Sequence, residues 1–189
     1  MNNPVNSNVR TKSVVAFVTA LLFFTACSSP LLNTYKGSAK DLLPEQVNNY
    51  KKGDKVPAGT LGIGNASKGL KTIDEEAAIY SLNNKSLRFS AIVFDSPESA
   101  TKVLKVFRLG ASSEQGINVK NDGEKKKGWS TLGDRFEIEA LLPVRRDETP
   151  KVTEQIYWTN GSVLFSIMGD GTSDIVSADL KAFEDALAY

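Results

Sequence analysis

The chain has 189 residues, 41% of them hydrophobic and 24% charged, which is typical of one globular domain with or without a targeting segment. The 23 basic and 22 acidic side chains nearly balance, which argues against electrostatic capture of nucleic acid. The chain has no histidine, so Ser-His-Asp, Cys-His and histidine–metal sites are excluded. Its only cysteine, Cys27, excludes a disulfide within the chain.

The N-terminus has the layout of a secretory signal. Residues 1–12 are polar and carry Arg10 and Lys12, and residues 14–26 form an uncharged apolar run that ends directly before Cys27. As a helix, such a run reaches about 20 Å, less than the roughly 30 Å hydrocarbon core of a bilayer. A signal peptide is therefore expected here rather than a membrane-spanning helix.

The end of this run, Thr25-Ala26-Cys27, resembles the lipobox of bacterial lipoproteins, with Phe24 where that family usually has Leu. The resemblance covers residues 1–30. It implies cleavage after residue 26 and acylation of Cys27, with palmitate as the expected acyl group, and two or more acyl chains anchor a protein stably. In that family Ser at position 28 implies transfer to the periplasmic side of the outer membrane, where the cell has one. The alternatives are an ordinary secreted protein and an uncleaved N-terminal anchor.

We expect residues 27–40 to form a lipidated tether and residues 41–189 one domain, with internal units at about 56–112 and 115–189. Leu43-Pro44-Glu45 predicts a short helix that places Val47 and Tyr50 in the core and ends at Gly53. Residues 56–63 predict a first strand, followed by a glycine-rich loop.

Two later segments are similar, IYSLNNKSLRFSAI (79–92) and IYWTNGSVLFSIM (156–168), and the match continues at an offset of 76 into the following segments. Each copy predicts a β-hairpin followed by a helix, over 97–109 in the first unit and near 174–188 in the second. Either a duplication or the shared physics of hairpin–helix units explains the similarity. Residues 117–120 and 135–142 predict further strands.

The hairpins predict which side chains share a face. Asn160-Gly161 favours a two-residue type I′ turn with Trp158 opposite Val163, and Asn83-Asn84-Lys85 favours a turn one residue longer. One face then collects apolar core residues, and the other carries a candidate binding face of Tyr80, Arg88, Tyr157 and Leu164. The expected fold class is a two-layer α+β domain, an antiparallel sheet with both helices on one face and a half-wet second face.

Two patterns suggest catalysis. Ser99 and Lys102 fit the S-x-x-K nucleophile motif of penicillin-binding proteins and β-lactamases, but the S-D-N and K-T-G companions are absent. Glu75-Glu76 and the pair Glu137 and Glu139 are candidates for the two carboxylates of sugar cleavage, and are equally typical of solvated strand positions. A helix start and solvated side chains explain these residues better than an active site does.

Three further motifs are incomplete. Gly62-Ile63-Gly64 lacks the rest of a phosphate-binding loop, and Asp170–Asp174 lacks the later ligands of a calcium loop. Lys125–Lys127 with Trp129 suggests a nucleic-acid or anionic-lipid patch, but neighbouring acids nearly neutralise it. No metal site, cofactor or nucleic-acid partner is expected.

The mature sequence is similar to uncharacterised envelope lipoproteins with Leu-Pro-Glu and Phe-Asp-Ser-Pro-Glu helix starts, here residues 43–45 and 94–98, a likeness that implies no function. We expect a lipid-anchored envelope protein, a non-catalytic binding or accessory module that meets a protein, a lipid or a wall polymer. The alternative is a small envelope hydrolase using Ser99 and Lys102 or an acidic pair.

Overall fold

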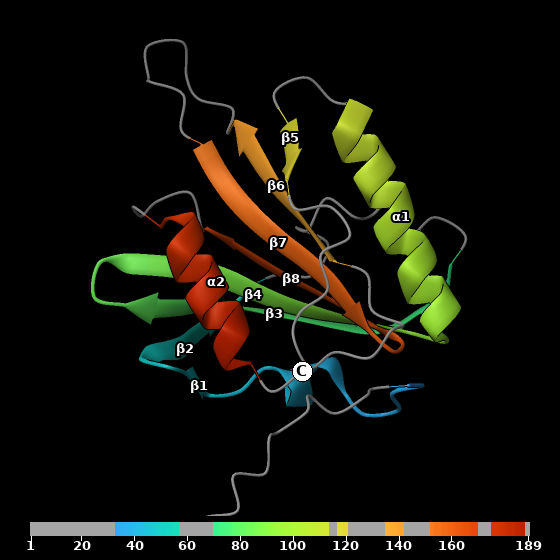
Figure 1. The fold of residues 1–189 in the computed structure, drawn as a ribbon. Helices are drawn as coiled ribbons and strands as arrows, with labels where there is room; N and C mark the ends of the chain where they lie inside the picture. Colours follow the sequence, from blue (N-terminus) through green and yellow to red (C-terminus); the bar gives the residue numbers. More distant parts are fainter. Residues whose placement is uncertain are drawn as a thin grey trace, which may run out of the picture.

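The computed structural model describes residues 33–56, 70–113, 117–120, 135–141, 152–169 and 175–187. They form a 3₁₀ helix, two α-helices and eight strands (Figure 1). The helices are η1 (Ala39–Leu42), α1 (Pro97–Ser113) and α2 (Ser177–Ala186). The strands are β1 (Gln46–Val47), β2 (Tyr50–Lys55), β3 (Thr72–Leu82), β4 (Lys85–Phe94), β5 (Ile117–Lys120), β6 (Arg135–Leu141), β7 (Val152–Asn160) and β8 (Val163–Gly169).

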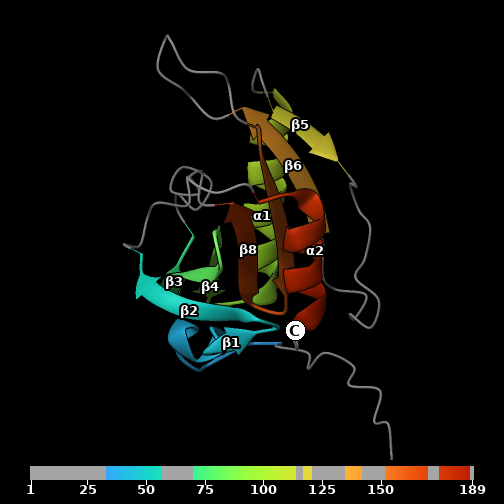
Figure 2. The ribbon, with the colours of Figure 1, turned by 90° about the vertical axis from the view of Figure 1, so that its left-hand side faces the viewer.

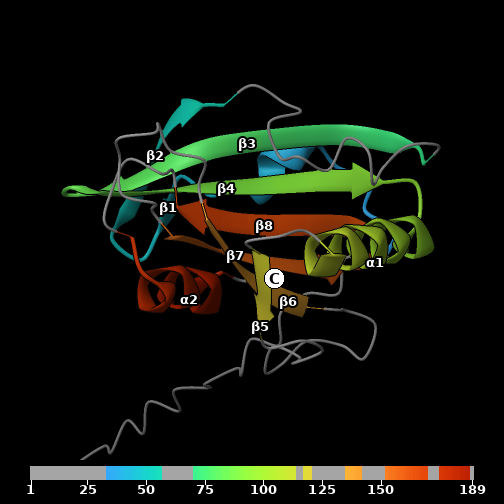
Figure 3. The same cartoon turned by 90° about the horizontal axis from the view of Figure 1, so that it is seen from above.

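The strands form one sheet in the order β1-β2-β3-β4-β8-β7-β6-β5, with every neighbouring pair antiparallel. Viewed from above, β3, β4 and β8 run side by side, and α2 and α1 lie near opposite ends of β8 (Figure 3). The α+β fold class and the antiparallel sheet are thus confirmed.

The expectation that both helices cover one face is wrong. Leu180 and Phe183 of α2 pack in a core with Trp158 and Phe165, whereas Leu104 of α1 packs in a second core on the other face. Strand neighbours point to opposite faces, so β7 supplies Trp158 to the first core and Tyr157 to the second. Figure 1 shows β7 running between the two helices. The domain therefore has helices on both sides of the sheet.

Connection length gives a physical reason for this difference. Only residues 95 and 96 separate β4 from α1, so this helix begins beside the end of its strand. Residues 170–176 separate β8 from α2, and a connection of that length allows the helix to reach the other face. There Phe183 makes edge-on ring contacts with Tyr50, Tyr80 and Phe89, at centroid separations of 5.7, 5.1 and 5.7 Å.

Both hairpins form, but each has a register different from the predicted one. Leu82 pairs with Lys85, and Trp158 pairs with Phe165 rather than with Val163, so each turn has two residues. Only the first turn residue has positive φ, 55° at Asn83 and 57° at Gly161, whereas a type I′ turn needs positive φ at both. In the second hairpin the pairing shifts by two positions, an even number, so its side chains keep their predicted faces. The shorter first turn moves β3 by one position and reverses its faces.

The matched hairpins meet at the centre of the sheet. Ser90 of β4 pairs with Ser166 of β8, the residue 76 positions later, and their buried hydroxyl oxygens are 2.6 Å apart. Beside them the rings of Phe89 and Phe165 stack at 6.0 Å and 8°. The offset found in the sequence therefore corresponds to a near-symmetric strand pair, although the two helices do not follow that symmetry.

The short helix expected after Leu43 is a strand hairpin instead. Val47 pairs with Tyr50 across a turn in which Asn48 has a φ of 51°, a left-handed conformation that asparagine tolerates better than most residues. Val47 and Tyr50 are nevertheless buried, as predicted. Figure 2 shows β1, β2 and η1 beneath β3 and β4. This segment closes the lower side of the first core. The strand expected over 56–63 lies almost wholly outside the described residues.

Candidate functional site

The structure does not bring the four residues of the candidate binding face together. Tyr80 pairs with Leu87 and points into the first core, where its hydroxyl donates a 2.6 Å hydrogen bond to the carbonyl oxygen of Pro44. Arg88, the next residue along β4, lies on the opposite face. The cause is the two-residue turn between β3 and β4, which places Tyr80 one position away from the predicted register.

Tyr157 and Leu164 share the other face, as predicted, but α1 covers them. Both side chains are 1% exposed, and the ring of Phe107 lies 4.8 Å from that of Tyr157. Ala100, Val103 and Leu104 of α1 complete this second core. The face expected to be half wet is therefore an interior layer at these positions.

Polar groups lie beneath the same layer. The hydroxyl of Tyr157 donates to Oε1 of Gln155, and burial raises the pKa of Tyr157. Burial also lowers the pKa of Arg88, while the negative charge of Glu75 opposes that shift. The hydroxyls of Ser90 and Ser166 bond to each other. A buried tyrosine with a raised pKa is a weaker acid, and mutually bonded hydroxyls satisfy one another, so this arrangement stabilises packing rather than supplying a reactive group.

Ser99 is engaged in capping α1. Its hydroxyl donates a 2.7 Å hydrogen bond to Oδ1 of Asp95, and its backbone N–H donates to Oγ of Ser96 at 3.2 Å. A side chain that accepts from the N–H three residues later is the usual N-cap arrangement. Lys102 is exposed, and no hydrogen bond joins it to Ser99 in the described structure.

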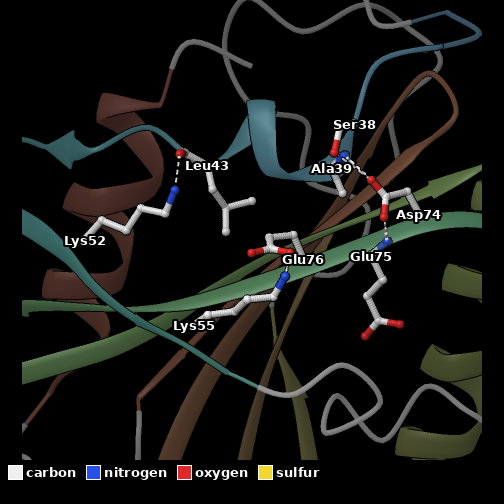
Figure 4. Close-up of polar contacts among 8 residues, drawn as sticks. All are labelled: Ser38, Ala39, Leu43, Lys52, Lys55, Asp74, Glu75 and Glu76. Carbon is white, nitrogen blue, oxygen red and sulfur yellow. Dashed lines mark hydrogen bonds and ion pairs between the residues drawn. The ribbon is translucent and has the colours of Figure 1, made fainter.

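The two acids at the start of β3 do not form a catalytic pair. Glu75 pairs with Ile92 and Glu76 with Ala91, so the two side chains leave opposite faces of the strand. Figure 4 shows them pointing apart, with Glu76 directed toward Lys55. The Glu76 carboxylate lies 2.6 Å from Nζ of Lys55, an ion pair that satisfies it.

Glu137 belongs to an ion cluster that was not predicted from the sequence. Arg135 donates to Glu137 and makes two 2.8 Å hydrogen bonds to Glu184, the second partner contributed by α2. The side chains of Arg135 and Glu184 are 3% and 1% exposed. Burial lowers the pKa of Arg135, but Glu184 and Glu137 outweigh that effect and raise it. The sequence does indicate that Glu184 is buried, because it lies on the apolar stripe of α2 with Leu180, Phe183 and Leu187.

The segment assigned to the tether is folded onto the domain from residue 33. The backbone N–H of Ser162, in the β7–β8 turn, donates to the carbonyl oxygen of Asn33 at 2.6 Å, and the N–H of Tyr35 donates to Oγ of Ser162 at 2.8 Å. Ala39 is fully buried. Residues 33–40 are therefore part of the fold, and Asn33, the first residue that the structure describes, lies beside this turn.

Asp74 fastens the same segment to β3. Its Oδ2 accepts 2.8 Å hydrogen bonds from the backbone N–H of Ala39 and the hydroxyl of Ser38, and Figure 4 shows both contacts. The bond from Ala39, then that from Ser38, lowers the pKa of Asp74 below its ordinary value of 3.8. Lys52 holds the next part of the segment by donating to the carbonyl oxygen of Leu43 at 3.0 Å.

Several predicted positions lie outside the described residues: Cys27, Gly62–Gly64, Lys125–Lys127, Trp129 and Asp170–Asp174. Within the described ranges no group of three or more acidic or cysteine side chains is placed to hold a metal ion. No helix in the described part of the chain has the length and apolar character needed to cross a membrane.

No family model, curated protein or solved structure matches this chain.

Proposed function

We propose that the protein is a lipid-anchored component of the bacterial cell envelope, with a non-catalytic domain that acts as a binding or accessory module. The observation that carries the proposal is the position of Cys27, the only cysteine in the chain, at the end of a short apolar run. Ser28 favours the periplasmic side of the outer membrane, in a cell that has one, as the site of the anchor.

The tether implied by this proposal is short. Five residues separate Cys27 from Asn33, whose carbonyl oxygen accepts the hydrogen bond from Ser162. Six steps of extended chain span about 20 Å at roughly 3.3–3.6 Å per residue. An acylated Cys27 would therefore keep the β7–β8 turn close to the membrane surface, and partners of the domain would be envelope proteins, lipids or wall polymers within that reach.

The described side chains favour a binding role over hydrolysis. The hydroxyl of Ser99 donates to Asp95 at the start of α1 rather than bonding to Lys102, and Glu75 and Glu76 point apart. Glu137 bonds to the buried Arg135. A nucleophile or general acid needs contact with its base or with substrate, and these groups are engaged in caps and ion pairs instead.

Fatty-acid labelling tests the anchor. Cells grown with an alkyne palmitate should label the wild-type protein and a Ser29→Ala control equally. Cys27→Ser should remove the label and leave a precursor that keeps residues 1–26, as read by intact mass. Label on Cys27→Ser at the wild-type level would refute the proposal, because no other thiol exists to carry the acyl chain.

A further inference from the structure

The outer face of α1 carries charges of opposite sign in separate turns. Glu98 lies in the first turn of the helix, and Lys102 and Lys105 follow it at helical spacing. All three side chains are exposed, and together they line one open hollow along the helix. No ion pair joins any of them to another residue in the part of the chain that the structure describes. This face is therefore acidic at its start and basic in its middle.

Exposed apolar side chains lie near both ends of the same helix. Val106 and Leu109, which are 43% and 71% exposed, follow the lysines and line the same hollow. Ile73, which is 53% exposed, lies near the other end, because the neighbouring Thr72 pairs with Phe94 shortly before α1 begins. Along the helix, the charges of Glu98, Lys102 and Lys105 therefore stand between two exposed apolar positions.

We propose that the outer face of α1 pairs with α1 of a second copy of this chain, antiparallel and about a two-fold axis. Setting Glu98 opposite Lys102 of the second copy places the axis at the level of residue 100, and the symmetry repeats the same ion pair on the other side. Lys105 then comes level with Asp95 of the second copy, which is also exposed. A parallel pair would instead set each charge opposite its own kind.

Charge complementarity selects a copy of this chain as the occupant, because the face complements itself when it is reversed. Antiparallel pairing also carries Leu109 past the first turn of the second helix, toward the end at which Ile73 of the second copy is exposed. The one arrangement therefore matches opposite charges and brings exposed apolar side chains of the two copies to the same end. A single helix pair is a small interface, so the dimer is weak and a covalent trap is needed to measure it.

Introduced cysteines measure the direction of the pair. Thr101 lines the same hollow, and at 1.5 Å per residue its two copies would lie about 3 Å apart along the helices, whereas two copies of Leu109 would lie about 27 Å apart. Thr101→Cys and Leu109→Cys are each introduced into the full chain, purified in a nonionic detergent and oxidised with copper phenanthroline. Peptide mass spectrometry counts only links between identical introduced positions, which leaves Cys27 out of the measurement. We expect a linked dimer at position 101 and little at position 109.

Charge reversal tests the pairing itself. In the Thr101→Cys chain, Glu98→Lys alone or Lys102→Glu alone should lower the linked dimer at least about fivefold, because symmetry replaces two ion pairs by two like-charge contacts. A mixture of these two variants should restore the dimer, since the basic face of one complements the acidic face of the other. Lys181→Glu, at an exposed position of α2 on the opposite side of the sheet, is the matched control and should leave the dimer unchanged.

Three results would overturn the inference. The first is no linked dimer at position 101, and the second is equal linking at positions 109 and 101, which indicates random collision or parallel pairing. The third is a dimer that charge reversal does not lower or that the mixture does not restore. Glu98 and Lys102 are exposed, so their variants are expected to keep the wild-type urea midpoint. None of these measurements depends on acylation of Cys27, so failure of the anchor and failure of the pairing are separate outcomes.

Discussion

Removing the buried charge of Arg135 should destabilise the domain strongly. The Arg135→Met variant leaves the carboxylate of Glu184, 1% exposed, without both of its 2.8 Å hydrogen bonds. Breaking a buried pair by removing one partner costs about 3–5 kcal/mol, because the remaining charge stays out of water. Glu184→Gln should cost less, about 1–3 kcal/mol, since Arg135 keeps Glu137 and the amide retains part of the hydrogen bonding.

The double variant separates the ion pair from the packing around it. Arg135→Met with Glu184→Leu removes both charges while keeping similar volume, and such replacements are often neutral or stabilising. We expect it to recover most of the loss seen in Arg135→Met. Lys85→Met is the control, because its partner Asp179 and Lys85 itself are 20% and 37% exposed and an exposed pair contributes at most about 1 kcal/mol.

Urea unfolding measures these differences. Trp158 is fully buried, so its fluorescence reports loss of the first core, and far-ultraviolet circular dichroism supplies a second probe. The reasoning is refuted if Arg135→Met costs no more than Lys85→Met, or if the double variant is as unstable as Arg135→Met.

Three further outcomes follow from the structure. Stability that depends on Asp74 should be present above its unfolded pKa and lost as pH falls through the lowered folded pKa, so Asp74→Asn should flatten the fall in urea midpoint below about pH 4. Ser166→Ala should cost about 1–3 kcal/mol because it leaves the Ser90 hydroxyl buried alone, and Ser90→Ala added to it should restore part of that stability in a double-mutant cycle. Tyr157→Ala should destabilise about as much as Phe165→Ala, roughly 3–5 kcal/mol, because both rings are buried; a Tyr157 variant within 1 kcal/mol of wild type by urea unfolding would contradict this.

Alternation along the strands predicted the first core well. Ile156 and Trp158 recur with period two on β7, as do Val163, Phe165 and Ile167 on β8. A change of two positions in the pairing of Trp158 left these side chains on the same face. The predicted turn of the first hairpin was wrong by one residue. Asn83 and Asn84 form the whole turn. The sequence Asn-Asn-Lys does not determine whether Lys85 belongs to the turn or to the strand. That one position moved Tyr80 from the predicted outer face into the core.

The positions of the helices were not predictable from their own periodicity. An amphipathic stripe shows that α2 packs on something apolar, but both faces of this sheet are apolar near its centre. Only one member of the buried ion pair was predictable from the sequence. Glu184 on an apolar stripe predicts a buried cation nearby, but its partner Arg135 stands 49 positions earlier, beyond the reach of local patterns. Long-range partners of this kind are set by topology.

The covering of both sheet faces limits where a partner can bind. Reaching Tyr157 from outside requires moving α1, whose Phe107 ring contacts it, and that would expose Val103, Leu104 and Ile92. Each fully buried side chain of this kind contributes roughly 1.5–3 kcal/mol, so the three together approach the 5–15 kcal/mol that stabilises a whole domain. Binding a partner therefore costs less on a surface that is already open, such as the outer side of α1 with Val106 and Leu109.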